Sequence, residues 1–388
     1  MNIVMKLSKL CNLRCTYCYE YAELANKERM PIESIEYFFK SIAQYASRHP
    51  GIPIHLILHG GEPLLLPHEY LRTVCALRDR YLASEGVRLK TSVQSNLYSL
   101  PEATLDLLSE LSLELGISVD VFGDQRVDIN ARLSQDRVLR NLQRVVDRHI
   151  PVGGIAVLHA QNVDKVEKTY RFFNALDIDL RFLPIFASAD AAARMQHLLL
   201  SHEQIVAALK RLVSLQFSEP TGIDVYPVKD YMDAAVRYLT GSEIDPYDPA
   251  DREWALIINT NGDTYSHGDA YSPAGYMGNV FRQTLDEIFA GPQYAAVTAV
   301  RSERARLCGN CSYSRHCDQL SVVEAIASER GSDAQGNPVC SIARPMIQFI
   351  VEEMRRSSSA MTLLELHASE RSARSTFRRQ SNGSFAAQ

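Results

Sequence analysis

The sequence contains no apolar stretch long enough to cross a membrane, since none of its runs approaches about 18 consecutive apolar residues. Its first residues, MNIVMKLSKLC, also lack the long apolar core and the small-residue cleavage site of a secretory signal. We therefore expect a cytoplasmic protein that has no membrane partner.

The sequence also has no excess of positive charge. The 41 Lys and Arg residues are outnumbered by 46 Asp and Glu residues, which gives a net charge of -5. A protein without a basic field has no general attraction for phosphate backbones, so we do not expect nucleic acid as a partner. The 388 residues, of which 46% are hydrophobic and 22% charged, suit a globular protein of one large domain or two to three smaller ones.

The cysteines are not spaced as a disulfide framework. They fall into a group of three, a single residue and a group of four along the chain. Thiols in the cytoplasm stay reduced, so this grouping favours metal binding or catalysis over disulfides. The single residue, Cys75, follows the helical spacing of Leu71 and Val74, and we interpret it as a buried core residue.

Strand-like runs alternate with helical patterns over the first half of the chain. The segment from Asp136 to Ile150, for example, repeats its apolar residues at the spacing of a helix packed on a sheet. Strands joined by helical crossovers form a parallel, right-handed α/β sheet whose ligands bind at the carboxyl ends of the strands. The expected strands are Ile3–Leu7, Ile54–His59, Lys90–Ser95, Leu115–Val121, Val152–His159 and Leu180–Ile185.

The pattern changes near residue 190. A loop runs into a helix expected from Ser201, and the Pro- and Asp-rich stretch EIDPYDPADRE is typical of a linker. Beyond it, Asn261 and Gly262 separate two strand-like runs and predict a tight hairpin turn. The Ser- and Arg-rich last residues predict a flexible tail. The expected domains are a barrel core at 1–190, a helical bridging region at 191–255, a C-terminal domain at 256–354 and the tail at 355–388.

The first cysteine group, CNLRCTYC, carries three thiols, on Cys11, Cys15 and Cys18. They lie just past the end of the first expected strand, where one loop can aim all three thiolates at a single centre. A structural zinc ion requires four ligands, and a 4Fe-4S cluster is normally held by four cysteines. Three cysteines therefore indicate either a zinc knuckle with its fourth ligand elsewhere or a cluster with one iron open to a ligand that is not protein.

With Tyr17 before the third cysteine, this segment reads C-x3-C-x-aromatic-C and resembles the radical S-adenosylmethionine (SAM) family. The resemblance implies a partial, TIM-like (β/α)6 barrel over roughly the first 185 residues. It also implies that SAM binds the open iron of a 4Fe-4S cluster, and that one-electron reduction cleaves SAM to a 5'-deoxyadenosyl radical.

Residues at the ends of the expected strands extend the resemblance. The segment HGGEP after the second strand resembles the GGEP segment of the family, whose backbone and Glu62 would meet the SAM amino group. In the family, residues at the ends of the third and fourth strands contact the SAM ribose or carboxylate. The cofactor-binding residues implied in this way are Tyr17, Gly60, Gly61, Glu62, Pro63, Gln94, Ser95, Asn96, Ser118 and Asp120.

The second cysteine group has the spacing C-x2-C-x5-C with a distant fourth cysteine, which is a complete set of four ligands. Spacing alone allows either a structural zinc ion or a fully protein-ligated 4Fe-4S cluster. The region is similar to the C-terminal extension known as SPASM, in which such a quartet holds an auxiliary cluster. The metal ligands implied for this second site are Cys308, Cys311, Cys317 and Cys340.

Other cysteines of the SPASM pattern are missing. Ser321 stands where the extension has a further cysteine, and the hairpin reads Ser266-His267 where the family often has proline and cysteine. We therefore expect one auxiliary 4Fe-4S cluster and two clusters in total. By the same resemblance Asp269 is a candidate catalytic base, whereas a turn-capping role is its simpler explanation.

The resemblance implies an enzyme that modifies a ribosomally made precursor peptide, by a carbon-carbon (cyclophane) or carbon-heteroatom crosslink. The alternatives are a sulfatase-type formylglycine maturase, a thioether-forming or epimerising maturase, and a non-enzymatic iron-sulfur or zinc scaffold. The implied partners are the precursor peptide and a reductant such as flavodoxin or ferredoxin. A leader-recognition domain, if the reaction requires one, is expected to be a separate protein or to be replaced by the barrel edge, since only ten residues precede Cys11 and the tail is short and polar.

Overall fold

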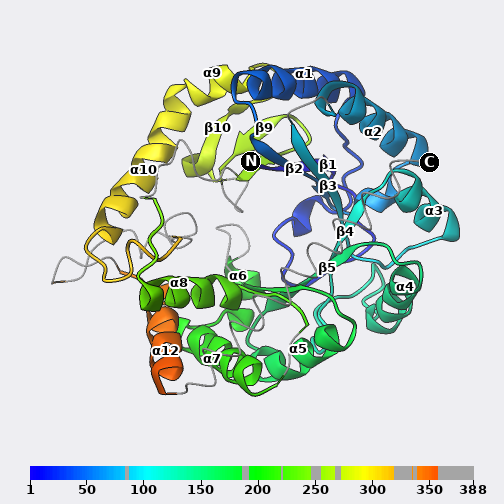
Figure 1. Cartoon of the computed structure of the whole chain (residues 1–388). Coiled ribbons are helices and arrows are strands. Elements are labelled where there is room, and N and C mark those ends of the chain that lie inside the picture. The colour runs from blue at the N-terminus through cyan, green and yellow to red at the C-terminus, as the bar shows by residue number, and fades with distance from the viewer. Residues whose placement is uncertain are drawn as a thin grey trace, which may run out of the picture.

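The computed structural model describes residues 1–83, 87–185, 192–219, 222–245, 255–266, 272–318, 334 and 339–356. Within these residues a single curved sheet carries its helices on the outer side (Figure 1). Its strand order is β10-β9-β8-β1-β2-β3-β4-β5-β6-β7, parallel from β8 to β7 and antiparallel in the β8-β9-β10 meander. The strands are β1 (Asn2–Ser8), β2 (Pro53–Gly60), β3 (Arg88–Ser95), β4 (Glu114–Ser118), β5 (Val152–Leu158), β6 (Leu180–Pro184), β7 (Val225–Tyr226), β8 (Ala255–Ile258), β9 (Asp263–Tyr265) and β10 (Tyr276–Asn279).

Successive side chains of the parallel strands face opposite sides of the sheet, which separates an apolar outer face from a polar inner face. In β1, Ile3, Met5 and Leu7 are completely buried in the main hydrophobic core. Lys6, between them, lies opposite His59 in the β1–β2 register and is paired with Glu20. The inner face of the sheet can therefore bind polar ligands without exposing the core.

The helices between the strands are amphipathic and bury their apolar stripes on the outer face. In α1 the stripe comprises Ile35, Phe38, Phe39 and Ile42. No helix of the described residues is both long and apolar enough to span a membrane. The helices are α1 (Ile32–Arg48), α2 (His68–Leu82), α3 (Glu102–Glu110), α4 (Gln135–Asp147), α5 (Val166–Ala175), α6 (Ala192–Met195), α7 (His202–Ser218), α8 (Val228–Thr240), α9 (Leu285–Phe289), α10 (Pro292–Cys308) and α12 (Ala343–Arg356). Short 3-10 turns are η1 (Tyr21–Glu23), η2 (Pro63–Leu65), η3 (Val163–Lys165), η4 (Gln196–Leu198) and η5 (Pro273–Gly275).

The six parallel strands and the α/β barrel class predicted from the sequence are confirmed. The fourth strand is shorter than predicted, because it ends at Ser118 and the chain then leaves the sheet. The hairpin at Asn261 is also confirmed, with Gly262 at φ 87° in the left-handed region that favours glycine. The helix expected from Ser201 begins at His202, with Ser201 as its N-cap.

The sheet continues beyond the six predicted strands in both directions. The two-residue strand β7 adds to one edge next to β6, and β8 pairs with β1 from Asn2 opposite Ala255 to Met5 opposite Ile258. The C-terminal hairpin thus extends the barrel sheet directly. The predicted tail lies outside the described residues beyond Arg356.

Two aromatic residues of α1 allow a matched test of this packing. Phe39 is completely buried and Tyr37 is 40% exposed. We expect Phe39→Ala to lower the free energy of unfolding by about 3–5 kcal/mol, because it leaves a cavity in the core. Tyr37→Ala, on the exposed face, should change it by less than about 0.5 kcal/mol. Urea unfolding followed by circular dichroism measures both, and equal effects would contradict this packing.

Candidate functional site

The three N-terminal cysteines lie on one loop at the carboxyl end of β1, and all three are free thiols. Burial raises the pKa of Cys11 to about 11 and that of Cys18 to about 12, and it also raises the pKa of Cys15. The neighbouring thiols add to these shifts for Cys11 and Cys18, so the three groups are close enough to repel one another as thiolates. A cationic centre between them would remove this repulsion and stabilise the thiolates.

The backbone of this loop is held by contacts with distant segments. The Arg14 amide donates to the Val127 carbonyl at 2.7 Å, and the Thr16 amide donates to the Gln125 carbonyl at 2.9 Å. On the other side, the Arg194 guanidinium donates to the Cys18 carbonyl at 2.7 Å and also to the Thr16 carbonyl. These contacts fix the backbone that carries the three cysteines.

The segment after β2 lies directly against the start of the cysteine loop. The Gly61 amide donates to the Ser8 carbonyl and the Glu62 amide to the Leu10 carbonyl, both at 2.8 Å. A Cβ atom on Gly61 would lie inside the van der Waals radii of the Lys9 and Leu10 carbonyls. Gly60 has φ 140°, which a side chain would strain. Glycine is therefore required here by the close approach of two backbones, and Pro63 then begins the buried turn η2.

Glu62 is a buried carboxylate that is partly neutralised by backbone donors. It accepts the Asn96 amide at 2.7 Å and the Leu64 amide at 3.1 Å. These bonds lower the pKa of Glu62, but burial outweighs them and raises it to about 7. A cation beside this carboxylate would therefore be strongly favoured.

The polar residues at the ends of β3 and β4 differ in what they contact. Gln94 donates to the Ser118 hydroxyl at 2.9 Å, and both side chains are on the inner face of the sheet. Asn96 donates to Asn12 at 2.9 Å and to the Cys11 thiol at 3.6 Å. Ser95 accepts the Leu97 amide at 3.0 Å and is buried, and its side chain also hydrogen-bonds Glu62, so it supports both the turn after β3 and that carboxylate.

Tyr17 and Asp120 form a hydrogen-bonded group with Arg126, a residue that the sequence analysis did not single out. The Tyr17 hydroxyl donates to Asp120, and Arg126 donates to the Tyr17 oxygen at 3.3 Å. Burial lowers the pKa of Arg126, but Tyr17, Cys15 and Asp120 outweigh burial and raise it, so the guanidinium is charged. Its Nε atom is buried and has no hydrogen-bond partner among the described residues. Arg126 thus brings an incompletely satisfied cation close to Cys15.

The second cysteine group lies at the carboxyl end of α10 and before α12. Burial raises the pKa of Cys308 to about 11; Arg304 lowers it, and the nearby Cys340 and Cys311 raise it further. Arg304 also donates to the Val339 carbonyl, which joins α10 to the segment that carries Cys340. The fold therefore brings together cysteines that are far apart in the sequence.

Neither cysteine group is arranged around a single metal ion. Over the described parts of the chain, which include all seven of these cysteines, no three His, Cys, Asp or Glu side chains converge on one ion position. Zinc ligands lie about 2.3 Å from a common centre, whereas an iron-sulfur cluster separates its thiolates by several atoms.

Several other predictions from the sequence concern residues outside the two cysteine groups. Cys75 is buried in α2, as predicted. The segment VKDYMDAA, with Asp230, Tyr231 and Asp233, is typical in sequence of a solvated helix start. At the start of α8 this is wrong for Tyr231, which is buried, and for Asp230, whose pKa is raised to about 6 by burial and then by the charge of Asp318, whereas the side chain of Asp233 is half-exposed and pairs with Lys229. The hairpin-exit residues His267 and Asp269, and also Ser321, lie outside the described residues.

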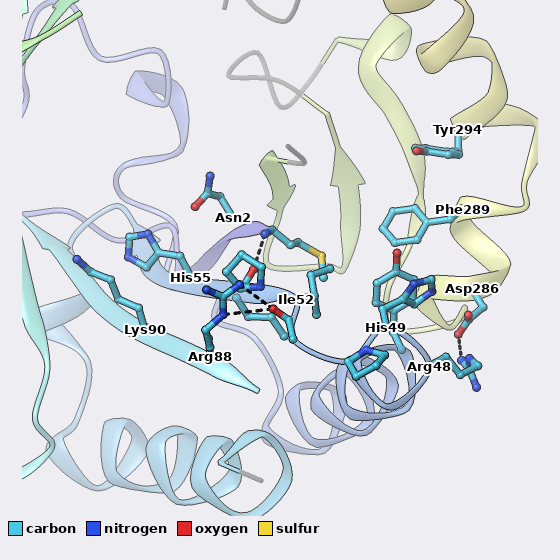
Figure 2. A pocket seen from close by; sticks show the side chains of 16 residues that line it. Asn2, Arg48, His49, Ile52, His55, Arg88, Lys90, Asp286, Phe289 and Tyr294 are labelled. Atoms are coloured by element: carbon cyan, nitrogen blue, oxygen red, sulfur yellow. Dashed lines mark hydrogen bonds and ion pairs between the residues drawn. The ribbon is translucent and has the colours of Figure 1, made fainter. Parts of the chain in front are cut away.

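A separate cavity of about 1200 Å³ opens at the amino ends of β1, β2 and β3 (Figure 2). Asn2, His55 and Lys90 line it from these strands, and Tyr294 of α10 closes the other side. The cysteine loop follows the opposite end of β1. Because ligands of parallel α/β sheets bind at the carboxyl ends, this cavity is not part of the candidate site.

Two family models match the sequence. The model of the radical SAM superfamily matches residues 5–173, and the model of SPASM, an iron-sulfur cluster-binding domain, matches residues 253–314.

Similar curated proteins include two sulfatase maturases. The cysteine-type anaerobic sulfatase-maturating enzyme of Clostridium novyi is 22% identical over 56% of this chain and 59% of its own length. The serine-type anaerobic sulfatase-maturating enzyme of Bacteroides thetaiotaomicron is 24% identical over 74% of this chain and 73% of its own length.

Two solved structures share the fold. Native anSMEcpe with bound AdoMet and a peptide superimposes with a TM-score of 0.72, at 16% identity, over 94% of this chain and 99% of that chain. Streptococcus suis SuiB bound to the precursor peptide SuiA gives a TM-score of 0.55, at 15% identity, over 82% of this chain and 70% of that chain. At these sequence identities, the similarity to the two solved structures shows a shared fold alone.

The contact between the two backbones at Gly61 can be tested by adding a methyl group. We expect Gly61→Ala to push the segment after β2 away from the cysteine loop and to lower the iron bound after anaerobic reconstitution by about half, if each group holds one four-iron cluster. Gly153→Ala is the matched control, because a Cβ there would meet no atom within 4 Å. Iron and sulfide assays of both variants measure the effect, and full iron content in Gly61→Ala would contradict it.

Proposed function

This chain is an enzyme that carries a radical SAM domain and an iron-sulfur cluster-binding SPASM domain, and we propose that it matures a ribosomally made precursor peptide. In this proposal a carbon of the peptide loses a hydrogen atom and then forms a carbon-carbon (cyclophane) or carbon-heteroatom crosslink. The observation that carries the proposal is the cysteine loop with three grouped thiols beside a buried anion, Glu62, and a buried cation, Arg126.

These residues fit the cofactors that the two domains imply. Cys11, Cys15 and Cys18 would hold a 4Fe-4S cluster with one iron left for SAM. The methionine part of SAM carries an ammonium and a carboxylate, and Glu62 and Arg126 supply the complementary charges in buried positions. When bound, the cluster and SAM together supply the 5'-deoxyadenosyl radical that abstracts hydrogen.

The other residues of the site would position these groups. Asp120 fixes the Tyr17 hydroxyl and also accepts the Val157 amide at 2.9 Å, so the Tyr17 ring is held next to Cys18. Gln94 and Ser118, joined on the inner face of the sheet, offer hydrogen-bonding groups for the SAM ribose. Ser95 and Asn96 support the site from behind, through the turn after β3 and through Glu62 and Cys11.

We propose that Cys308, Cys311, Cys317 and Cys340 hold one auxiliary 4Fe-4S cluster that accepts or relays an electron. Four protein ligands leave this cluster no open iron, so direct ligation of a substrate thiol is not favoured. Ser266 stands in the hairpin where the SPASM pattern often has the proline before a cysteine ligand of a first auxiliary cluster. It is buried, and its backbone amide donates to the Gly275 carbonyl at 3.0 Å. Asp269 stays a proposed catalytic base.

Sulfatase maturation is the second candidate function, since similar curated proteins are named as sulfatase maturases. The two reactions give different products. Tandem mass spectrometry of a co-expressed precursor peptide would detect a crosslink as the loss of two hydrogens shared between two residues, whereas a sulfatase peptide would carry formylglycine at a single Cys or Ser. A short open reading frame beside the gene would identify the peptide to test, together with any separate leader-recognition protein.

Iron counting tests the proposed number of clusters. We expect about eight irons per chain after anaerobic reconstitution, as two four-iron clusters require. The triple variant Cys11→Ser, Cys15→Ser, Cys18→Ser and the variant Cys308→Ser, Cys311→Ser should each retain about four irons. A count of about twelve in the unchanged protein would mean that a further cluster exists.

The raised pKa of Glu62 predicts a pH dependence of SAM binding. Its pKa of about 7 means that the carboxylate is lost as the pH falls below 7, and with it the partner of the SAM ammonium. We expect the affinity for SAM to fall towards tenfold per pH unit below that point.

Glu62→Gln should bind SAM at least about tenfold more weakly at pH 8, because a charged hydrogen bond is removed, and its affinity should not follow this titration. Calorimetric titration of the reconstituted protein measures both effects. Glu110→Gln, an exposed carboxylate paired with Arg72, is the control. A pH-independent affinity in the unchanged protein would refute this role of Glu62.

A further inference from the structure

Two large aliphatic side chains are exposed on the connection between β4 and α4. Ile129 is 67% exposed and Leu133 is 60% exposed, more than any other large hydrophobic residue of the described chain. We call residues 125–133 the β4–α4 loop. The two residues lie four positions apart on this loop, and contiguous exposed apolar surface marks an interaction site, whereas single exposed apolar residues are normal.

The β4–α4 loop is ordered by its own hydrogen bonds. Asp128 accepts the amides of Asn130 at 2.8 Å and Arg132 at 3.0 Å, and it accepts the Tyr98 hydroxyl at 3.1 Å. An isolated bridge between Val127 and Leu133 closes the loop. Ile129 and Leu133 are therefore exposed on a constrained loop.

This loop is also continuous with the cysteine loop. The carbonyls of Gln125 and Val127 accept the amides of Thr16 and Arg14, and Leu13 forms an isolated bridge with Asp128. The backbone between Cys11 and Cys18 thus lies directly beside the segment that leads to Ile129. A protein that covered Ile129 and Leu133 would sit next to the loop that holds the proposed SAM-binding cluster.

The charge of this region is opposite to that of the whole chain. Residues 124–144 contain five arginines and three aspartates, but Arg126 is buried and Arg144 pairs with Glu102, whereas the whole chain has a net charge of -5. Arg132, Arg137 and Arg140 are exposed, and none of them has an ion-pair partner among the residues that the structure describes. Asp124 and Asp136 are the exposed acids of this stretch, so three exposed arginines stand against two exposed aspartates. The surface therefore combines an apolar centre with a net positive rim and is complementary to an acidic protein.

We propose that the β4–α4 loop, with the exposed arginines of α4, is the docking surface for an acidic FMN-containing electron carrier of the flavodoxin type. This rests on the proposed function, which requires one electron from outside the chain. In the transfer the flavin hydroquinone loses one electron to the iron-sulfur centre and becomes the semiquinone, and no proton or covalent bond is exchanged. The dimethylbenzene edge of a flavin is apolar, so it suits the exposed pair Ile129 and Leu133.

The position of the cavity described above supports the choice of the β4–α4 loop as the docking surface. The cavity at the amino end of β1 is lined by basic side chains, among them Arg88 and Lys90. The seven residues of β1 separate it from the cysteine loop by roughly 20 Å, at about 3.3 Å per residue. A carrier bound at that cavity would be much farther from the cluster than one bound at the β4–α4 loop.

The test compares Ile129→Ser, Leu133→Ser with the control Tyr37→Ser, which removes an exposed side chain from α1. Binding of oxidised flavodoxin to the immobilised full chain is measured by biolayer interferometry, and the oxidation of flavodoxin hydroquinone by absorbance. We expect the double variant to lose at least about tenfold in both, as removal of central apolar contacts does at interfaces. Arg132→Glu, Arg137→Glu should weaken binding and reduce its salt dependence.

Titanium(III) citrate is a small reductant that needs no docking surface, so it separates the effect of a variant on flavodoxin docking from its effect on the reaction. With it, the double variant should form 5'-deoxyadenosine from SAM as fast as the unchanged protein. Any one of three outcomes in the double variant would overturn the proposal. These are unchanged flavodoxin binding, slower turnover with titanium citrate, and a loss of affinity for ferredoxin or peptide but not for flavodoxin. If the unchanged protein forms no 5'-deoxyadenosine with titanium citrate, the proposed function fails, while the affinity for flavodoxin still decides whether this surface binds the carrier.

Discussion

The parallel pairing of β1 with β2 is the constraint on which the site depends. Their register places Ser8 opposite Gly60, and the ladder continues beyond the strands through the Gly61 and Glu62 amides. The cysteine loop and the segment after β2 are thereby joined before any cofactor binds. A shift of one residue would reverse the faces of Lys6 and His59 and would move Glu62 away from Cys11. The hydrophobic outer face, with Ile3, Met5 and Leu7 completely buried, prevents that shift.

Burial makes the charged forms of the site's acidic groups less stable. The thiols of the cysteine loop have raised pKa values, Glu62 has a pKa near 7, and Arg126 keeps its charge although its Nε atom has no partner within the described residues. In its charged form, each of these groups would be stabilised further by a ligand of opposite charge. The scaffold therefore holds them in place before cofactors bind, as expected for a preorganised binding site.

Much of this arrangement could be predicted, because its signals are local in the sequence. The alternating strands, the three-cysteine loop and the glycines before Glu62 each follow from patterns within a few residues. Contacts between distant segments gave no such signal. Arg194 reaches the Cys18 carbonyl across 176 positions, and the burial of Arg126 depends on how the β4–α4 loop folds. The exposure expected at the start of α8 was wrong for the same reason, since Asp318 and the packing of Tyr231 are distant in sequence.

The pairing of β8 with β1 has a consequence for biosynthesis. β1 is hydrogen-bonded on both edges, but its partner on one edge ends at Ile258, about 250 positions later in the chain. At roughly 5–20 residues per second, translation from β1 to β8 takes about 10 to 50 s. During that time β1 keeps one edge open, next to three reduced cysteines. The pairing with β8 thus completes a strand made about 250 residues earlier, and until then its open edge can pair with another chain.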